Sequence, residues 1–416
     1  MRKQILSIAA ILLSTALFLM GNGLMTTLIP VRAHLAHFAN LSIGFVGSAY
    51  YAGFVTGCFA GPRLLARVGH IRTFAVAAGV AAAATLAQGL LVNEIAWILT
   101  RGLFGFAAAN LYMVIESWLN DRADNATRGR IFASYLTVNF GGLIVGQWFY
   151  TAGRPESATL FMLAAMFYAV CLIPVGLTKL PQPAPAEVPE LRPLKLFQVA
   201  PVGVAGCIAV GFANASVWTF LPVYGQSIGL HRSLLAALMI AFTLGGTLIQ
   251  VPLGRLSDRM DRRYVIAGIS LAACLAGIAM FLFGHKSTQW TLILAATFGV
   301  MTLPLYGLSV AHANDRLPRD KFVEASATLL MINAVASVFG PPIAALVTAR
   351  AGMSALFLFT AAVHLLLLVF TLARIGVKES PPEETREPYA PVPQNASPAV
   401  LELDPRGPES GEPASA

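Results

Sequence analysis

The chain has 416 residues, of which 56% are hydrophobic and only 12% are charged, and its mean hydropathy is +0.70. Soluble domains carry about a quarter charged residues, so this composition excludes an ordinary water-soluble enzyme. The formal net charge is +8. Residues 379–416 hold eight acidic residues, two basic residues and nine prolines, and such a segment cannot bury a core. We therefore expect a disordered tail there and a strongly basic body in the rest of the chain.

Apolar segments near the 20 residues needed to cross about 30 Å of hydrocarbon recur along the body of the chain. Twelve of them are separated by charged or Pro- and Gly-rich breaks, at 6–31, 41–62, 73–92, 96–119, 131–151, 158–177, 198–223, 233–254, 264–284, 290–311, 325–348 and 353–373. The first follows Arg2 and Lys3, as in a signal peptide, but it is too long for one and lacks a convincing cleavage site. The sequence thus predicts an all-α membrane protein with twelve transmembrane helices.

The basic residues predict the orientation of these helices. Twelve spans place both termini on one side, and 22 of the 28 basic residues fall in the loops on that side, five in the opposite loops, and Arg101 within a span. Cytoplasmic loops carry such an excess. We expect both termini in the cytoplasm and the chain in the cytoplasmic (inner) membrane. The charges are spread over separate short loops, which disfavours a nucleic-acid-binding patch.

The chain repeats itself at an offset of 192 to 194 residues. Seven of nineteen positions in 104–122 are identical in 298–316, including Phe-Gly, Leu-Tyr and Asn-Asp-Arg with the same internal spacing. The sequence therefore predicts two six-helix halves of the same orientation, 1–177 and 198–378, joined by a cytoplasmic linker at 178–197 and followed by the tail at 379–416. Duplicated transporter folds hold substrate at the repeat interface and expose it alternately to each side.

The segment Gly254-Arg255-Leu256-Ser257-Asp258-Arg259-Met260-Asp261-Arg262-Arg263 resembles the loop motif of the major facilitator superfamily, although Asp261 replaces its second glycine. Arg101, Gly105 and Ala109 are similar to the family's fourth-span motif. Thr27-Leu28-Ile29-Pro30 and Val114-Ile115-Glu116-Ser117 resemble the YcaD-like bacterial group. The resemblance covers residues 1–378 and implies a secondary transporter that works by alternating access.

The loop motif predicts a cytoplasmic latch. Asp258 lies where two adjacent spans enter the cytoplasm, and an acid there can bridge to an arginine or to exposed backbone N–H groups. The alternative is that its arginines only anchor the topology. The residues assigned to the latch are Gly254, Asp258, Arg259 and Arg262, with Arg67 in the first-half loop, where Ala66 stands in place of the aspartate.

Charged residues within hydrocarbon are costly, and only Arg101 and Glu116 lie clearly within a span. Both fall on one stripe of the fourth span, roughly 22 Å apart along its axis. Glu116 is a candidate proton carrier, or else the partner of Arg122, Arg128 or Arg130 in a structural ion pair. Arg101 can attract an anionic substrate group, assist proton transfer, or tie to carbonyl groups at a helix end.

Uncharged polar residues complete the predicted site. The pairs Asn22/Asn214 and Asn139/Asn333 occupy equivalent places in the repeats, where they can bind substrate or simply tie helices together. Tyr112 and Tyr306 are candidates to line the cavity. Small residues allow close helix packing and predict surfaces that part during transport, with the second span facing the eleventh and the fifth facing the eighth by resemblance. These are Gly53, Gly57, Gly61, Gly142, Gly146, Gly245 and Gly340.

The expected function is secondary transport of a small solute, with protons as the coupling ion and the chain as a monomer in the lipid bilayer. An uncoupled facilitator, and a membrane receptor or lipid-handling protein on the same scaffold, are the alternatives. Phosphate-binding loops, zinc-ligand spacings and nucleophile triads do not stand out, and the four cysteines lie unpaired in apolar spans. We therefore expect no enzyme activity, no cofactor and no metal.

Overall fold

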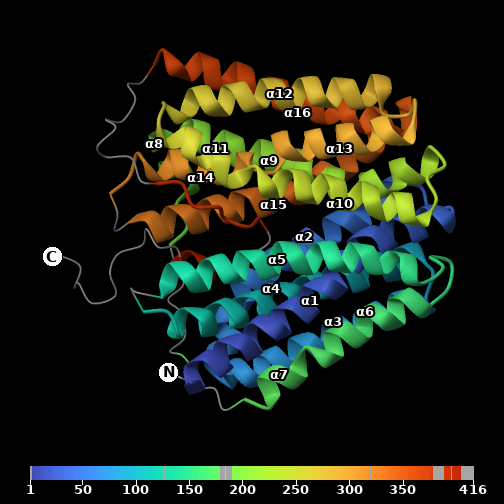
Figure 1. Ribbon diagram of the computed structural model, residues 1–416, viewed down its shortest axis with the longest axis vertical. Coiled ribbons are helices and arrows are strands. Elements are labelled where there is room, and N and C mark those ends of the chain that lie inside the picture. Colours follow the sequence, from blue (N-terminus) through green and yellow to red (C-terminus); the bar gives the residue numbers. More distant parts are fainter. Residues whose placement is uncertain are drawn as a thin grey trace. The chain divides into compact units, whose positions relative to one another are not determined.

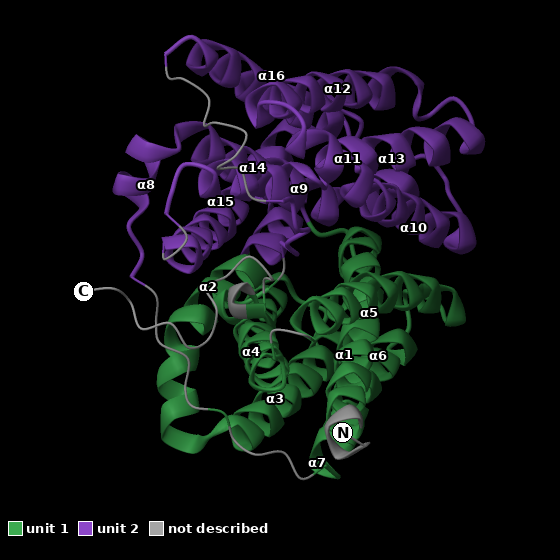
Figure 2. Ribbon diagram, turned by 60° about the vertical axis from the view of Figure 1, so that its left-hand side comes forward, with its two compact units in different colours: residues 1–38, 49–189, 395–416 green, residues 39–48, 190–394 purple. Residues whose placement is uncertain are grey.

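The computed structural model describes residues 2–124, 127–178, 183, 190–318, 321–377, 388–394 and 396–403, and the regular secondary structure of these residues is helical (Figure 1). The chain forms two compact units (Figure 2). Unit 1 comprises 1–38, 49–189 and 395–416, and unit 2 comprises 39–48 and 190–394. This division differs from the predicted boundaries, because residues 39–48 group with the second half and residues 395–416 with the first.

Each unit is a bundle of long helices. Unit 1 contains α1 (Arg2–Leu35), most of α2 (Asn40–Val68), α3 (His70–Leu90), α4 (Glu94–Asp121), α5 (Arg128–Phe149), α6 (Thr159–Val170), α7 (Leu172–Gly176) and the 3₁₀ helices η1 (Tyr150–Ala152) and η4 (Pro398–Leu403). Unit 2 contains α8 (Pro193–Val199), α9 (Pro201–Ser227), α10 (Arg232–Leu248), α11 (Gln250–Asp258), α12 (Arg262–Phe283), α13 (Thr288–Thr302), α14 (Leu305–Asn314), α15 (Phe322–Ala351) and α16 (Ala355–Ile375).

Three of the predicted spans are interrupted. Pro174, Pro252 and Pro304 lie within three residues of the breaks between α6 and α7, between α10 and α11, and between α13 and α14, respectively. Proline lacks the N–H that would bond to the carbonyl four residues earlier, so a helix bends or breaks there. Each pair of short helices therefore corresponds to one predicted span.

Eleven helices among the described residues are long and apolar enough to cross a membrane. The fifth predicted span, 131–151, is not among these eleven; it corresponds to α5, which has 22 residues. It is less apolar because it carries Tyr135, Asn139 and Gln147, all of which are buried inside unit 1. Burial within the bundle lets a spanning helix keep polar side chains, since they do not face lipid.

The duplication is visible in the packing of each unit. In unit 1, α1 packs on α5, α3 on α4 and α3 on α6; in unit 2, the equivalent pairs α9 with α15, α12 with α13 and α12 with α16 pack in the same way. The repeat found in the sequence therefore corresponds to a repeat of helix contacts.

Glycines at equivalent positions make the closest of these contacts. A Cβ atom added to Gly105 would lie 2.0 Å from the Tyr50 carbonyl oxygen, and one on Gly299 would lie 2.0 Å from that of Phe242. Two further pairs of equivalent glycines show the same closeness. An added Cβ atom would lie 1.9 Å from the Gly102 carbonyl oxygen at Gly53 and 2.2 Å from that of Ala296 at Gly245. It would lie 2.1 Å from the Met20 carbonyl oxygen at Gly146 and 2.4 Å from that of Phe212 at Gly340. Only glycine fits at such helix crossings.

These contacts differ from the predicted arrangement of the glycine surfaces. Gly53, Gly57 and Gly61 pack on α4, and Gly142 and Gly146 on α1. Gly245 faces Ala296 in α13, and Gly340 faces Phe212 in α9. The glycines thus meet helices of their own half. At these crossings the two backbones approach so closely that there is no room for a side chain. The contact expected between the second and eleventh spans involves other residues in unit 2, where Gly44 packs on Pro341 and Ser48 donates to the Val338 carbonyl.

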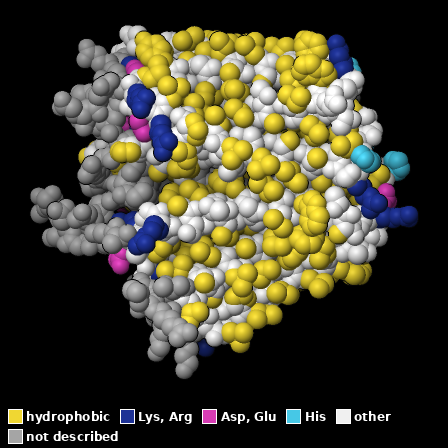
Figure 3. Space-filling model, viewed as in Figure 1, with side chains coloured by type: hydrophobic (Ala, Val, Ile, Leu, Met, Phe, Trp, Pro, Cys, Tyr) yellow, Lys and Arg dark blue, Asp and Glu magenta, His cyan; other side chains and the backbone are white. Residues whose placement is uncertain are grey.

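On the face shown in Figure 3, hydrophobic side chains are spread over the helices, and the charged side chains lie toward the two ends of the helices. Leu99 and Leu103 in unit 1 are 68% and 49% exposed, and Leu271 and Leu275 in unit 2 are 45% and 56% exposed. Exposed apolar stripes of this kind are unfavourable in water and suit contact with lipid. Of the basic residues counted for orientation, Arg2 and Lys3 (side chains), Lys179, Arg319, Lys378, Arg386 and Arg406 lie outside the described residues.

The tail at 379–416 differs from the expectation of disorder in the part that the structure describes. Residues 398–403 form η4, which packs on α4 and α5. Val392, Ala396, Val400 and Leu403 are at most 7% exposed. The average composition of the tail hides these few apolar residues, which are buried against the helices. Residues 379–387, 395 and 404–416 lie outside the described residues.

Candidate functional site

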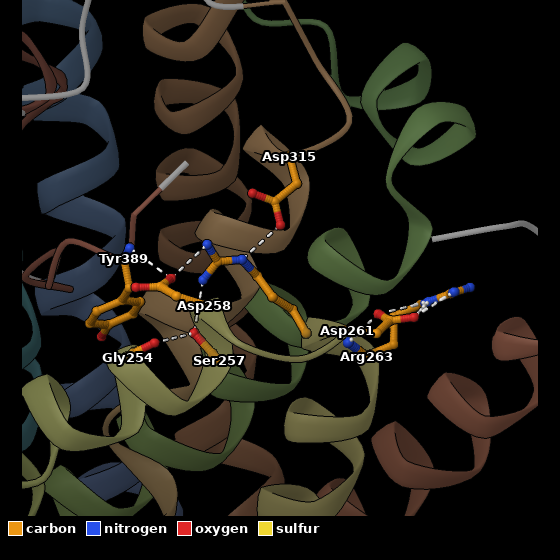
Figure 4. A network of polar contacts seen from close by, with 8 residues as sticks. Gly254, Ser257, Asp258, Asp261, Arg263, Asp315 and Tyr389 are labelled. Atoms are coloured by element: carbon orange, nitrogen blue, oxygen red, sulfur yellow. Dashed lines mark hydrogen bonds and ion pairs between the residues drawn. The ribbon is translucent and has the colours of Figure 1, made fainter. Parts of the chain in front are cut away.

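The predicted latch loop forms a buried polar network in unit 2 (Figure 4). The Arg262 side chain is 1% exposed and lies between two carboxylates. Its Nη2 is 2.9 Å from Asp258 Oδ1, and its Nε is 2.7 Å from Asp315 Oδ2. Its Nη1 donates to Ser257 Oγ at 2.8 Å. One guanidinium thus joins the end of α11, the start of α12 and the end of α14, because its fork can serve several acceptors at once.

Asp261 and Arg263 fix the start of α12 beside this network. Asp261 is the N-cap of α12 and accepts from the Arg263 backbone N–H at 3.0 Å. Arg263 Nη2 is 2.7 Å from Asp261 Oδ2, and Nη1 donates to the Ile375 carbonyl at the end of α16. The aspartate that replaces the motif glycine therefore serves as a helix cap. The equivalent Gly69 of the first half instead has a φ of 79°, which favours glycine.

The other latch residues are placed differently. Asp258 also accepts the Tyr389 backbone N–H at 2.9 Å, and a Cβ atom on Gly254 would lie 2.0 Å from Tyr389 Cδ1. Arg259 in unit 2 and Arg67 in unit 1 are exposed and make no ion pair within the residues described. In unit 1, His70 stands at the position equivalent to Arg262 and lies 2.9 Å from Ser117 Oγ. The described polar network is therefore a feature of unit 2.

Arg101 lies in an aromatic environment in unit 1. It is 8% exposed, and its guanidinium carbon is 4.8 Å from the Tyr50 ring centroid and 5.0 Å from that of Phe104. It has no carboxylate partner among the described residues, and its buried Nη1 has no hydrogen-bond acceptor there. Aromatic faces attract a cation, but they neutralise none of its charge. The arrangement therefore leaves a positive charge available to an anionic group.

Glu116 is fully buried in α4. Tyr135 of α5 donates its hydroxyl to Glu116 Oε1 at 2.6 Å, and the Ser397 backbone N–H donates to Oε2 at 2.9 Å. The Ser397 hydroxyl donates to the same oxygen. The ion pair considered for Glu116 with Arg122, Arg128 or Arg130 is absent from the residues that the structure describes. Its carboxylate is held by neutral donors alone, which satisfy hydrogen bonds without supplying a counter-charge.

The repeated asparagines have different surroundings in the two units. Asn333 Nδ2 donates to the Cys207 carbonyl at 3.0 Å and so ties α15 to α9. Asn139 lies beside the Tyr135 hydroxyl. Asn214 Nδ2 donates to Gln394 Oε1 at 3.3 Å. Asn22 lies next to both the Tyr50 and Tyr112 hydroxyls.

Aromatic residues predicted to line the cavity are buried. Tyr112 and Tyr306 are at most 1% exposed. Tyr112 packs edge-on against Phe18, with ring centroids 5.2 Å apart. The Tyr306 hydroxyl has no hydrogen-bond partner among the described residues. Both rings therefore belong to the interior of their own unit.

Sequence reasoning missed several partners of the candidate residues. Tyr135 and Ser397 hold Glu116, and Asp315 holds Arg262. A signal existed for Asp315, because it lies in the repeated Asn-Asp-Arg segment at 314–316. The composition of the segment containing Ser397 predicts disorder, and the contact of Ser397 with a residue 281 positions earlier leaves no local pattern in the sequence.

Comparison with known families agrees with this architecture. The model of the Major Facilitator Superfamily matches residues 11–240 and 203–403. The chain belongs to the major facilitator superfamily. It is therefore a multi-pass membrane transporter, and the fold and family predicted from the sequence are confirmed.

Relatives and solved structures cover most of the chain. The MFS-type transporter YcaD of Escherichia fergusonii is 25% identical over 373 residues, which are 89% of this chain and 95% of that relative. YcaD of Salmonella typhi is 25% identical over 361 residues, or 86% and 93% of the two chains. The nucleoside transporter NupG has a TM-score of 0.71 with 16% identity and covers 90% of this chain and 100% of its own. A D-xylose-proton symporter has a TM-score of 0.69 with 14% identity, covering 88% and 97%.

Proposed function

We propose that this chain moves a small solute across the cytoplasmic membrane by alternating access and couples that movement to protons. The observation that carries the proposal is the fully buried Glu116, which has neutral donors and no cation within the described residues. An ionised carboxylate without a counter-charge is costly in a low-dielectric interior. A carboxyl group in such a place is suited to pick up and release a proton as its surroundings change. The D-xylose-proton symporter among the similar folds is in keeping with this coupling.

The test has two steps, a search for a ligand by thermal shift and a measurement of its transport in proteoliposomes. Purified protein is screened by thermal shift against metabolite and drug libraries, because a ligand that binds the folded state raises its apparent stability. A labelled hit is then followed in proteoliposomes with and without an imposed pH gradient. We expect the gradient to drive accumulation by the wild-type protein. Equal flux with and without the gradient would indicate an uncoupled facilitator, and binding without flux would indicate a receptor.

Replacing Glu116 by Gln tests the proton carrier directly. The amide keeps the shape of the carboxyl but cannot exchange a proton, so we expect gradient-driven accumulation to be lost while exchange of labelled for unlabelled solute continues. The matched control is Glu156→Gln, which changes an exposed acid of the same unit. Accumulation that survives Glu116→Gln contradicts the coupling role.

Arg101 supports a substrate that carries an anionic group. Keeping an unpaired guanidinium buried costs several kcal/mol, and two aromatic contacts offset about 1–2 kcal/mol each of that cost. We therefore expect Arg101→Met to leave the melting temperature unchanged or raise it, while binding of an anionic hit falls at least tenfold. Arg101→Lys should retain part of the binding. A clear drop in melting temperature with unchanged ligand affinity would instead assign Arg101 a structural role.

A further inference from the structure

Two short stretches near the end of the described chain contact candidate transport residues, residues 388–394 within unit 2 and residues 396–403 within unit 1. In unit 1, Ser397 binds Glu116. In unit 2, Gln394 accepts from Asn214 and donates to the Leu303 carbonyl at 3.2 Å, and Tyr389 binds Asp258. Each contact is a hydrogen bond to a polar residue that the sequence assigns to the transport site or the latch, or to a neighbouring backbone carbonyl.

Ser397 fits the Glu116 site closely. It is fully buried, and its backbone N–H and its hydroxyl both donate to Glu116 Oε2. Its hydroxyl oxygen also accepts from the Ala399 N–H at 3.2 Å, and its carbonyl accepts from the Val400 N–H at 3.1 Å. The serine therefore begins the tight turn of η4 and presents two donors to one carboxylate oxygen.

The flanking residues give the segment an apolar anchor. Ala396 and Leu403 are fully buried and Val400 is 1% exposed. Val400 and Leu403 belong to η4, which packs on α4 and α5. Small apolar residues on both sides of a donor pair let the segment approach the carboxylate without displacing the helices.

Unit 2 holds its part of the segment through a different kind of contact. The Tyr389 ring fills the space left by two glycines: a Cβ atom on Gly254 would lie 2.0 Å from Tyr389 Cδ1, and one on Gly307 would lie 2.5 Å from its hydroxyl oxygen. Gly254 thereby has a role that the loop motif alone did not indicate. Gly254 and Gly307 thus leave the space into which the Tyr389 ring packs.

We propose that segment 388–403 is a tethered ligand of the Glu116 site, and that it must leave before Glu116 can serve a transported solute. The site accepts a pair of adjacent hydrogen-bond donors, an amide N–H and a hydroxyl, flanked by small apolar groups. Because the ligand is part of the same chain, its local concentration at the site is in the millimolar range or above. The proposal has two parts. That the segment must leave before transport rests on the proposed function, whereas the binding of the segment to Glu116 does not.

Occupancy is tested by thiol labelling of the full-length protein. The four native cysteines are replaced by alanine, and Val400→Cys introduces one thiol at a buried position. The cysteine side chain is close in size to the valine that it replaces. A maleimide should react with it slowly when Glu116 is intact. Since two hydrogen bonds to a charged group are lost, Glu116→Ala should accelerate labelling at least about tenfold. Glu156→Ala should not. The same pattern is expected when the thiol is introduced by Ala396→Cys instead.

Equal labelling in the Glu116→Ala and Glu156→Ala proteins overturns the proposal, as does fast labelling of the parent protein. Two controls detect general unfolding. The melting temperature of each variant is recorded, and each substitution at Glu116 or Glu156 is also made in protein that retains the four native cysteines, where general unfolding would speed the labelling of those buried thiols. This measurement needs no substrate and so gives a result even if the transport proposal fails.

The regulatory part is tested with Ser397→Asp, which removes the hydroxyl donor and places a like charge beside Glu116. We expect labelling at position 400 to rise at least about tenfold and flux of the solute found by thermal shift to rise with it. Faster labelling with unchanged or lower flux overturns the proposal. If no variant, including the wild type, transports any hit, the transport function fails while the labelling result still decides whether the segment binds Glu116.

Discussion

Replacing Gly105 or Gly299 with alanine is expected to destabilise the protein strongly, although alanine favours helices over glycine by about 1 kcal/mol. A single added methyl group would lie 2.0 Å from a backbone carbonyl oxygen of the neighbouring helix at either position. Backbone cannot move aside as a flexible side chain can, so two helices must separate. We expect a loss of about 3 kcal/mol or more, seen as a lower melting temperature and a reduced monodisperse peak in detergent.

The matched controls are Gly79→Ala in α3 and Gly268→Ala in α12. Both glycines are helical, and an added Cβ atom meets nothing within 4 Å. These substitutions should leave stability unchanged or raise it by up to about 1 kcal/mol. The sign of the effect is therefore expected to differ between the two sets. If Gly105→Ala matched Gly79→Ala in melting temperature and the protein failed only in transport, the glycine would belong to a moving surface.

Replacing Arg262 with alanine is expected to have the second large effect. The change leaves Asp315, whose side chain is 3% exposed, buried without its closest cation, and breaking a buried ion pair in this way costs about 3–5 kcal/mol. Arg262→Lys should recover part of this loss, since an ammonium keeps the charge but cannot span Asp258, Asp315 and Ser257 together. Thermal melting in detergent and yield of folded protein measure both effects.

Arg259→Ala is the control for charge in this loop, because Arg259 is exposed and makes no ion pair within the described part of the chain. It should change stability by no more than about 0.5 kcal/mol. The double variant Arg262→Ala with Asp315→Asn should be more stable than Arg262→Ala alone, since the uncompensated charge is removed. If the second substitution gave no recovery, the ion pair with Asp315 would not be the source of the loss.

Variants at Asp258 and at Asp315 separate two roles of the loop motif, its contact with Arg262 and its contact with segment 388–403. Asp258 contacts Arg262 and the Tyr389 N–H, whereas Asp315 contacts Arg262 from the end of α14. A variant at Asp258 therefore acts on both the network and segment 388–403. A variant at Asp315 acts on the network without touching Tyr389 directly. Comparing the two shows which contact the motif aspartate serves.

The sequence by itself determined the membrane class, the spans, the duplication and the family. Long apolar runs follow from the length of helix needed to cross lipid, and a repeat survives as identities at fixed spacing. Glu116 and Arg101 could be singled out for the same reason, because charge within an apolar run is rare whatever the fold. Such signals are local in the chain and do not depend on which helices touch.

Only the tertiary structure decided the partners. The helical period places Gly53 and Gly57 on one face, but it does not say that this face meets α4. The donors to Glu116 come from Tyr135, 19 residues away, and from Ser397, 281 residues away, in a segment whose average composition suggests no fold. Hydrogen bonds and close crossings depend on which surfaces are brought together in space, and the periodicity of a single helix carries no information about the surface opposite.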